Sequence, residues 1–319
     1  MWNWSRHTFY FRILVVAFSL LGHFDGAVQA DENGNSVIRA AAGDSEIVIT
    51  TTSRVAGAIH SLTWNGKEFI DSFDHGRQLQ SAANFSRGGE YFPETFNPTE
   101  AGSRKDGAGG TSTSRLLKIT TSGATLETTN QMAFWLAPGE LSSGHPAVND
   151  KLLSDHVVSK RVHIGHAILG RSLPHTIEYD VTFTVPPGEG HTFAQFEAVT
   201  GYMPAEFSRF WKFVSATRPL EELGDGPGEQ AFPVVFATSS GSHAMGVYSP
   251  DQPSPGFAAA GYGRFRFAAE KVTKWNCVFR IRNAAGIAAG DYKFRSFVVV
   301  GSLEAVKATL EELTSRSTK

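Results

Sequence analysis

The segment Thr176–Thr184 alternates apolar and polar residues, and this alternation constrains the fold more than any other feature of the chain. Its sequence is TIEYDVTFT. Successive side chains of an extended strand point to opposite faces. The apolar residues therefore share one face, namely Ile177, Tyr179, Val181 and Phe183, and the polar residues share the other, namely Thr176, Glu178, Asp180 and Thr182. Such half-buried alternation is typical of an antiparallel sheet with one face on a core and one in water.

Short runs rich in Val, Ile, Thr and Phe recur from Ser36 onward, separated by clusters of Gly, Pro, Asn and Ser. We count about a dozen such runs, more than the seven strands of an immunoglobulin-like domain. Many short strands with turn signals between them favour a sandwich or a barrel. We therefore predict an all-β fold, a large antiparallel two-sheet supersandwich, with residues 31–319 forming a single domain.

One segment has helical periodicity instead. Leu303, Val306, Leu310 and Leu313 lie at helical spacing, and Ser302 just before them is a favourable N-cap residue. This pattern predicts one C-terminal amphipathic helix that packs on the sandwich.

The first thirty residues have the features of a secretory signal peptide. Arg6, His7 and Arg12 precede the mostly apolar run Ile13–Leu21, and Val28-Gln29-Ala30 ends in the small-residue pattern of a cleavage site. The alternative is a membrane anchor that is never cleaved, but this run is shorter than the roughly 20 residues that span a bilayer. We predict removal of residues 1–30, a secreted or periplasmic protein, and no membrane span in the remainder.

Charge argues against a nucleic-acid partner. The chain has 29 basic and 31 acidic residues, of which Arg6, Arg12 and Asp25 lie in the leader, so 27 basic and 30 acidic residues remain. A net charge of −3 without a basic run lacks the positive patch that nucleic-acid binding requires.

Cys277 is the only cysteine, so an internal disulfide is excluded and the fold must be held by its core. Because it lies in a β-like run, we interpret Cys277 as a buried, inert thiol in preference to a nucleophile.

A hairpin followed by polar residues occupies Gly57–Ala82. Asn65-Gly66 is a strong signal for a tight hairpin turn, and after the returning strand the chain presents Asp74, His75, Arg77, Gln78 and Gln80. A guanidinium and two amides can pair with hydroxyls or carboxylates, and a histidine can exchange a proton near neutral pH. We predict that Arg77, Gln78 and Gln80 bind substrate and that His75 is catalytic. The alternative is a turn whose polar groups cap strand ends.

Asn97 and Glu100 open a long Gly- and Ser-rich loop over residues 97–113. Loops longer than about 12–15 residues without secondary structure tend to be functional or disordered. We predict Asn97 as a ligand-binding residue and Glu100 as a general base, with turn capping as the alternative reading.

Six of the eleven histidines fall between His145 and His191. His163 and His166 are three residues apart, so a regular strand would point them to opposite faces. The sequence also lacks a His-Glu-x-x-His motif and a Cys/His ligand quartet. We therefore expect no metal and no cofactor, and instead a histidine paired with Glu178 or Glu197 as acid and base.

Aromatic residues gather in Tyr202–Phe213, where Tyr202 and Trp211 are the residues that could face a sugar ring. Core packing is the alternative. The chain contains no Gly-x-Ser-x-Gly elbow, P-loop or dinucleotide fingerprint, which disfavours serine hydrolases, nucleotide enzymes and redox enzymes.

The opening hairpin resembles the N-terminal part of the galactose-mutarotase-like superfamily. The positions that carry the resemblance are Gly57-Ala58-Ile59-His60-Ser61-Leu62, Gly66 and His75-Gly76-Arg77. The resemblance implies a β supersandwich acting on carbohydrates, with Arg77 in the sugar-binding position and His175 as general acid. The general base of the family is a late Glu; Glu229 is a stand-in that lies earlier than the family pattern expects.

We therefore expect a secreted carbohydrate-active enzyme, an epimerase, lyase or hydrolase, that uses a histidine with a carboxylate or a tyrosine. The expected catalytic residues are His75, His175, Glu100, Glu178 and Tyr202, and the expected substrate-binding residues are Arg77, Gln78, Gln80, Asn97 and Trp211. The alternative is a non-catalytic carbohydrate-binding or envelope protein of the same fold. A histidine beside a carboxylate or tyrosine in the cleft of Arg77 would favour the enzyme, and a cleft of amides and aromatics alone would favour the binder.

Overall fold

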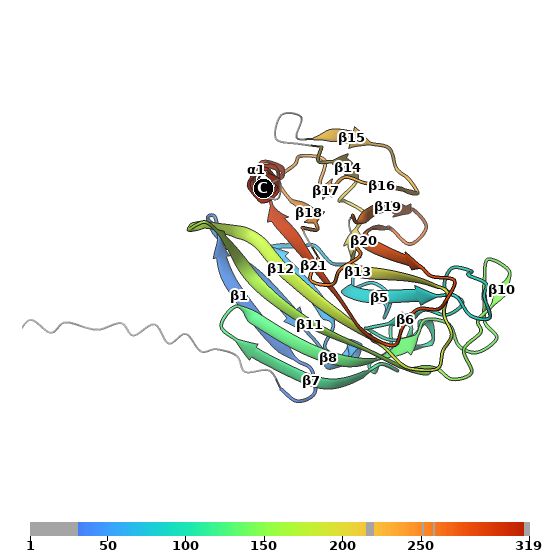
Figure 1. Cartoon of the computed structure of the whole chain (residues 1–319). Coiled ribbons are helices and arrows are strands. Elements are labelled where there is room, and N and C mark those ends of the chain that lie inside the picture. The colour runs from blue at the N-terminus through green and yellow to red at the C-terminus, as the bar shows by residue number, and fades with distance from the viewer. Residues whose placement is uncertain (1–30, 215–219, 251, 258, 316–319) are drawn as a thin grey trace, which may run out of the picture.

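The computed structural model describes residues 31–214, 220–250, 252–257 and 259–315. The predicted signal peptide, residues 1–30, lies outside the described residues. Within the described ranges the chain forms twenty-one β-strands, one α-helix and two short 3-10 helices, at Ser53–Val55 and Arg104–Asp106. All strand pairings are antiparallel, which confirms the predicted fold class (Figure 1).

The first layer of the sandwich contains nine strands. In order of pairing they are β7 (Arg115–Ser122), β8 (Thr125–Phe134), β11 (Leu153–Ile168), β12 (Arg171–Val185), β21 (Gly290–Gly301), β18 (Ala244–Tyr248), β17 (Val234–Ala237), β14 (Arg209–Lys212) and β15 (Glu221–Leu223).

The second layer contains eight strands in a row. In order of pairing they are β1 (Ser36–Ala42), β2 (Ser45–Thr51), β3 (Ile59–Trp64), β5 (Leu79–Phe85), β13 (Phe193–Pro204), β20 (Val272–Arg282), β19 (Gly261–Phe267) and β16 (Gly228–Gln230).

Four short strands complete the set. β4 (Lys67–Glu68) pairs with β3. β6 (Pro98–Thr99) pairs with β5 of the second layer and with β8 of the first layer, and so connects the two layers. β9 (Leu141–Ser142) and β10 (His145–Pro146) form a separate small hairpin.

The core lies between the two layers. The ring centroids of Phe183 in β12 and of Phe294 in β21 each lie 5.2 Å from that of Phe196 in β13. The Phe183 and Phe294 centroids are 6.0 Å apart. The apolar residues of the Thr176–Thr184 segment are all buried there, as the alternation predicted. Thr176 is buried as well, contrary to the prediction, because its cross-strand neighbour Val299 belongs to the apolar cluster under the C-terminal helix.

The helix α1 spans Leu303–Thr314 and confirms the predicted C-terminal helix. The Ser302 side chain accepts a hydrogen bond from the Ala305 N–H, which satisfies one of the unpaired donors at the helix start. Val306, Leu310 and other apolar residues of α1 are buried against the outer side of β17, β18 and β21. The helix thus covers one end of the first layer (Figure 1).

Two bulges change which side chains share a face. In β11 the pairing with β12 shifts between Ile164 and His166, and the extra residue is Gly165, with φ +101°. His163 and His166 therefore lie on the same outer face, and the prediction that they point to opposite faces is wrong. In β13 the pairing with β20 shifts between Glu197 and Val199. This second bulge brings Glu197 to the same face as residues further along the strand.

Candidate functional site

A cleft lies on the outer face of the second layer, over β5, β13 and β20. It consists of two adjoining hollows of about 100 Å³ and about 230 Å³ that share Gly76, Glu94, Trp135 and Tyr202. Alternate residues of β5, Gln80 and Asn84 among them, point into the cleft, while the intervening residues point into the core. The cleft is therefore built on strands, with loops forming its rim.

The floor of the cleft holds a contact network of three titratable side chains. Lys274 Nζ lies 3.2 Å from Glu197 Oε2 and 5.1 Å from the centroid of the Tyr202 ring. Tyr202 and Lys274 are cross-strand partners in β13 and β20. Glu197 is an odd number of residues from Tyr202, so a regular strand would place the two on opposite faces. The bulge in β13 instead places Glu197 on the same face as Tyr202, beside Lys274.

Burial and the network determine the protonation states. Burial acts to lower the pKa of Lys274, but Glu197 and Tyr202 outweigh it and raise that pKa, so the ammonium stays charged. Burial raises the pKa of Tyr202 despite the opposing effect of the Lys274 charge. At neutral pH the floor therefore carries a protonated phenol beside an ammonium.

Glu94 projects from the rim in a strained conformation. Its φ is +67°, in the left-handed region that non-glycine residues avoid. Its N–H donates to Asn84 Oδ1 at 3.0 Å, and its Oε2 accepts a hydrogen bond from Ser142 Oγ at 2.8 Å. Strained residues that are held by their surroundings concentrate at functional sites.

Trp135 forms one wall of the cleft and packs closely on Gly76. A Cβ at Gly76 would lie 2.7 Å from Trp135 Cη2, so this position has no room for a side chain. Arg77, the next residue, lines the wider hollow. Its Nε lies 3.1 Å from Asp74 Oδ2, and its Nη1 lies 3.8 Å from Asp71 Oδ1.

The structure brings together four of the ten predicted site residues. Arg77, Gln80, Asn97 and Tyr202 all line the cleft. The hairpin turn that precedes them is also as predicted, because Asn65 and Gly66 both have positive φ, 49° and 72°.

His75 and Gln78 do not face the cleft, which corrects two predictions. His75 is fully buried, and its ring nitrogens lie 2.7 Å from the Gly107 and Arg54 carbonyl oxygens. The Gln78 amide nitrogen donates to the Asp74 carbonyl at 2.6 Å. Both side chains hold loops together, as the alternative reading of this segment proposed.

Glu100 is also buried in the core, which corrects its assignment as a general base. Its carboxylate forms an ion pair with Lys160 of β11 and accepts a hydrogen bond from the Ser81 N–H at 3.0 Å. Both side chains of the pair are essentially inaccessible to solvent, with exposures of 0% and 1%. Glu100 connects the two layers beneath the cleft floor and cannot reach a ligand.

The remaining three predicted residues, His175, Trp211 and Glu178, lie away from the cleft. His175 Nδ1 lies 2.8 Å from the Val300 carbonyl oxygen, and the ring lines a separate hollow with Trp64 and Ser302. A carbonyl only accepts, so Nδ1 is the donor. Trp211 lies on β14, with the Arg209 guanidinium 5.2 Å from its ring centroid. Neither residue lines the cleft.

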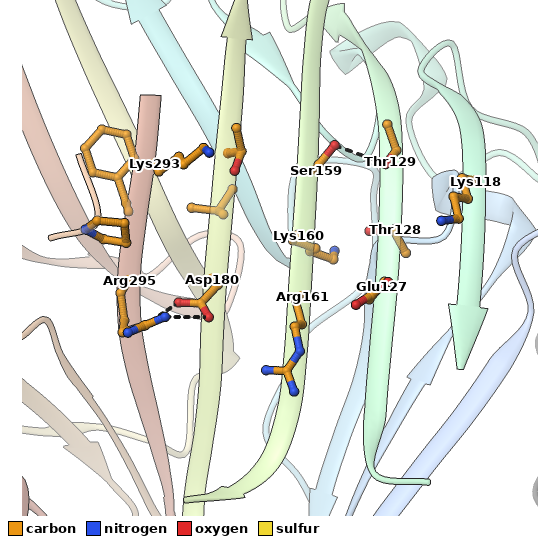
Figure 2. Close-up of a pocket in the computed structure, with 14 residues that line it drawn as sticks. Lys118, Glu127, Thr128, Thr129, Ser159, Lys160, Arg161, Asp180, Lys293 and Arg295 are labelled. Carbon is orange, nitrogen blue, oxygen red and sulfur yellow. Dashed lines mark hydrogen bonds and ion pairs between the residues drawn. The ribbon is translucent and has the colours of Figure 1, made fainter. Parts of the chain in front are cut away.

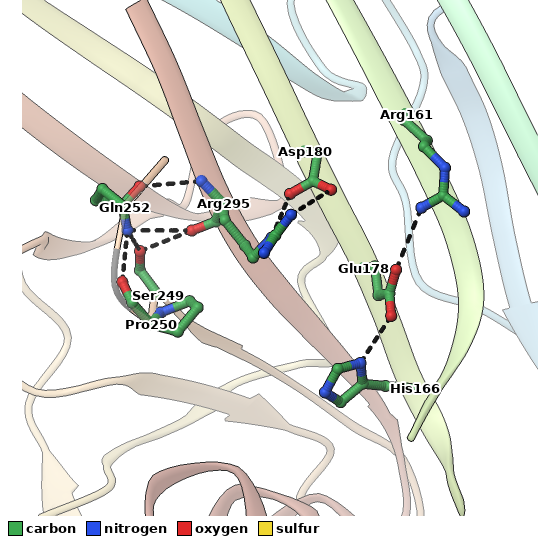
Figure 3. A network of polar contacts seen from close by, with 8 residues as sticks. All are labelled: Arg161, His166, Glu178, Asp180, Ser249, Pro250, Gln252 and Arg295. Carbon is green, nitrogen blue, oxygen red and sulfur yellow. Dashed lines mark hydrogen bonds and ion pairs between the residues drawn. The ribbon is translucent and has the colours of Figure 1, made fainter. Parts of the chain in front are cut away.

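Glu178 lies on the outer face of the first layer, as Figure 3 shows. It accepts from His166 Nδ1 at 2.7 Å and from Arg161 Nη1 at 3.2 Å. Glu178 thus has the histidine partner that the sequence led us to expect, but the pair is remote from Arg77. Glu229, which the family resemblance suggested as a general base, forms a bidentate ion pair with Arg280, with distances of 2.7 and 2.8 Å.

A second, larger hollow of about 360 Å³ lies on this same outer face (Figure 2). Its polar side chains form rows in register across the strands, one of which is Lys118, Thr129, Ser159, Thr182 and Lys293. The adjacent row contains the Asp180–Arg295 ion pair, 2.7 Å long. These side chains stand parallel on an open sheet and do not converge, so we favour the cleft on the other layer as the functional site.

The sequence reasoning missed Glu94, Trp135 and Lys274, and it considered Glu197 only as a partner for a histidine. Lys274 had a recognisable signal, because it is a charged residue inside a run that is otherwise typical of a buried strand. Glu94 and Trp135 lie in loops, where no periodicity marks them. Among the described residues, no helix has the length and apolar character needed to cross a membrane.

No protein-family model and no curated protein matches this sequence. Solved structures match at low similarity. The alpha-galactosidase from Lactobacillus brevis is 7% identical with a TM-score of 0.41, and the match covers 84% of this chain and 40% of that chain. The alpha-N-acetylgalactosaminidase NagBb from Bifidobacterium bifidum is 10% identical with a TM-score of 0.45, over 88% and 39% of the two chains.

A third match is described as a candidate aldose 1-epimerase from Klebsiella pneumoniae subsp. pneumoniae. It is 9% identical with a TM-score of 0.41, over 91% of this chain and 93% of that chain. This chain therefore spans about 40% of the length of the first galactosidase and most of the epimerase-like protein. The matches include carbohydrate-active proteins of the kind that the sequence resemblance names, and they are partial.

Proposed function

We propose that this chain is an exported carbohydrate-active enzyme that binds a neutral sugar in the cleft and acts on it by acid–base chemistry. The observation that carries the proposal is the contact of Lys274 with both Glu197 and Tyr202 on the cleft floor. Interacting titratable groups with shifted pKa values, gathered in a cleft, are typical of acid–base sites.

The other lining residues suit sugar hydroxyls and ring faces. Asn97 lines the cleft, and its amide nitrogen donates to the Ala83 carbonyl, so Oδ1 is the atom of this side chain that could accept from a sugar hydroxyl. The Gln80 amide nitrogen donates to the Gly76 carbonyl, and its amide oxygen accepts from the Ala101 N–H. These two hydrogen bonds fix the orientation in which the amide could form a further hydrogen bond with a ligand. The aromatic face of Trp135 supplies apolar surface.

The charges of the lining favour a neutral sugar. Arg77 and Lys274 are the two cations, whereas Asp74, Glu94, Glu197 and Glu270 provide four carboxylates. A net negative lining repels a uronic acid. Hydrolysis or epimerisation therefore fits the cleft better than β-elimination, which starts from a uronate.

Two carboxylates are available for the chemistry. Glycoside hydrolysis canonically uses a pair of acidic residues that flank the scissile bond. We assign Glu197, which faces the Lys274 ammonium, as the ionised carboxylate, and Glu94 on the rim as the proton donor. Tyr202 supplies a neutral phenol that donates a hydrogen bond to the bound sugar.

The alternative is a carbohydrate-binding protein without turnover. One observation favours it: the described residues that line the cleft include no histidine, the residue that the enzyme hypothesis called for. Glu197 would then serve only to hold Lys274 in place as a hydrogen-bond donor.

A screen of neutral and anionic polysaccharides, read by reducing ends and by absorbance of unsaturated products, separates these proposals. We expect reducing ends from a neutral substrate, and loss of turnover by at least about 100-fold in Glu197→Gln and in Glu94→Gln. Binding, measured by affinity electrophoresis, should persist in both variants. Binding without turnover by the wild type, weakened by Trp135→Ala, would instead support the binder, and unsaturated products would contradict the neutral-sugar assignment.

Export is the remaining part of the proposal, and the composition of residues 1–30 supports it. Intact-mass measurement of the protein recovered outside the cytoplasm should give a chain that begins at Asp31. A retained leader would overturn this part without affecting the cleft.

A further inference from the structure

Two histidines and a glutamate meet at one end of the sandwich, outside the cleft. His156 belongs to β11, Glu189 lies in the turn between β12 and β13, and His191 lies just before β13. One donor atom from each lies within 4.8 Å of the others. His156 and His191 are 2% and 1% exposed, whereas the Glu189 side chain is 17% exposed and gives the cluster access to solvent.

The hydrogen bonds of His191 determine which nitrogen carries its proton. Nδ1 lies 2.6 Å from the Ser86 carbonyl oxygen, which can only accept, so Nδ1 must be the donor. In the neutral ring, Nε2 then directs a lone pair at Glu189 Oε2, only 2.7 Å away. Two acceptors at this distance repel each other unless a proton or a cation lies between them.

His156 lies in more apolar surroundings, and its ring nitrogens are unpartnered. Its Nε2 lies 3.1 Å from the same Glu189 oxygen, and neither ring nitrogen has a hydrogen-bond partner among the described residues. The ring packs against Phe85, Phe96 and Phe134, with centroids 4.8, 6.0 and 6.4 Å away. The ring is only 2% exposed, so bulk solvent does not supply the missing partner for either nitrogen. An unpartnered buried polar group of this kind requires an explanation.

We propose that His156, Glu189 and His191 bind a divalent transition-metal ion of the zinc type. Two imidazoles and a carboxylate are a known zinc ligand set. The Ser86 carbonyl orients His191 in the way that outer-shell acceptors orient metal-bound histidines. An ion at this point replaces the acceptor contact between His191 Nε2 and Glu189 with bonds to the cation, and it gives the unpartnered His156 ring a partner.

This inference is independent of the proposed function and revises the expectation that no metal binds. The expectation depended on local spacing, but the ligands come from one strand and from a turn 33 residues later. The ion would tie that turn and β11 to Ser86, at the end of β5. Because Asn84 of β5 lines the cleft, the site would stiffen one edge of the cleft floor.

Zinc and cobalt titrations of the untagged full-length protein, after removal of metals by chelation, test the proposal. We expect one bound equivalent by calorimetry, a rise in Tm on adding zinc, and visible absorption bands of the cobalt form. His156→Phe keeps the ring among its phenylalanine neighbours without a ligand atom, and Glu189→Gln keeps the shape without the charge. Each should weaken zinc binding by at least about 100-fold.

His163→Phe is the matched control, because His163 lies on the same strand but on the outer face, bonded to Thr125. It should bind zinc as the wild type does. Circular dichroism verifies that all three variants fold. Failure of the folded wild type to bind either metal, or equal affinity in His156→Phe and His163→Phe, would overturn the proposal.

Discussion

The buried Glu100–Lys160 pair provides the sharpest test of how this sandwich is held together, because the sequence had assigned Glu100 to catalysis. Replacing Lys160 with Met keeps the length of the side chain and removes its charge. Glu100 would then be a carboxylate with 0% exposure whose remaining polar contact is the Ser81 N–H. Leaving one charge of a buried pair without its partner costs about 3–5 kcal/mol.

The surface pair Lys151–Asp155 supplies the control. Its atoms are 2.6 Å apart, but its side chains are 51% and 60% exposed, so solvent screens the interaction. We expect Lys151→Met to leave the urea midpoint essentially unchanged. The double variant Lys160→Met/Glu100→Gln removes both buried charges and should recover at least half of the loss, because no unpaired ion remains.

Urea unfolding followed by tryptophan fluorescence measures all four proteins, and unchanged m values establish that the midpoint shifts report stability. A cost below about 1 kcal/mol for Lys160→Met would refute the reasoning, since it would mean that solvent reaches Glu100. The double variant should also retain glycan turnover. Loss of turnover at unchanged stability would restore Glu100 to the active site.

Three further predictions follow from individual contacts. In the metal-free protein, burial acts to raise the pKa of Glu189, but its contacts with the His156 and His191 rings outweigh burial and lower that pKa from 4.5 to about 2. The stabilisation is therefore complete above pH 4.5 and is lost as pH falls toward 2, by about 1–2 kcal/mol after allowance for solvent screening; urea unfolding at pH 3 and pH 6 should show this loss in the wild type and not in Glu189→Gln. Gly76→Ala places a methyl group against Trp135 and should weaken glycan binding in affinity electrophoresis by about tenfold, while unaltered binding would contradict the close packing. Ser302→Ala removes the N-cap of α1 and should cost about 1 kcal/mol in the same unfolding assay, whereas Ser302→Asp should not.

The fold was largely predictable because its determinants are local. The alternation in Thr176–Thr184, the Asn65-Gly66 turn and the spacing of apolar residues in α1 each depend on a few adjacent residues. The candidate site was predicted only in part, because a polar side chain near a strand end can face either a cleft or the core. His75 illustrates this: its partner carbonyls belong to Arg54 and Gly107, 21 and 32 residues away, and no local pattern reveals them.

The bulge in β13 has a consequence for how much variation in chain length such a cleft can tolerate. Glu197 and Tyr202 share a face because the bulge takes up one residue more than the partner strand requires. Deleting Ala198 would remove the bulge and leave the two side chains four residues apart, which is again the same face of a regular strand. Two relatives could thus present identical lining residues from strands that differ in length by one residue.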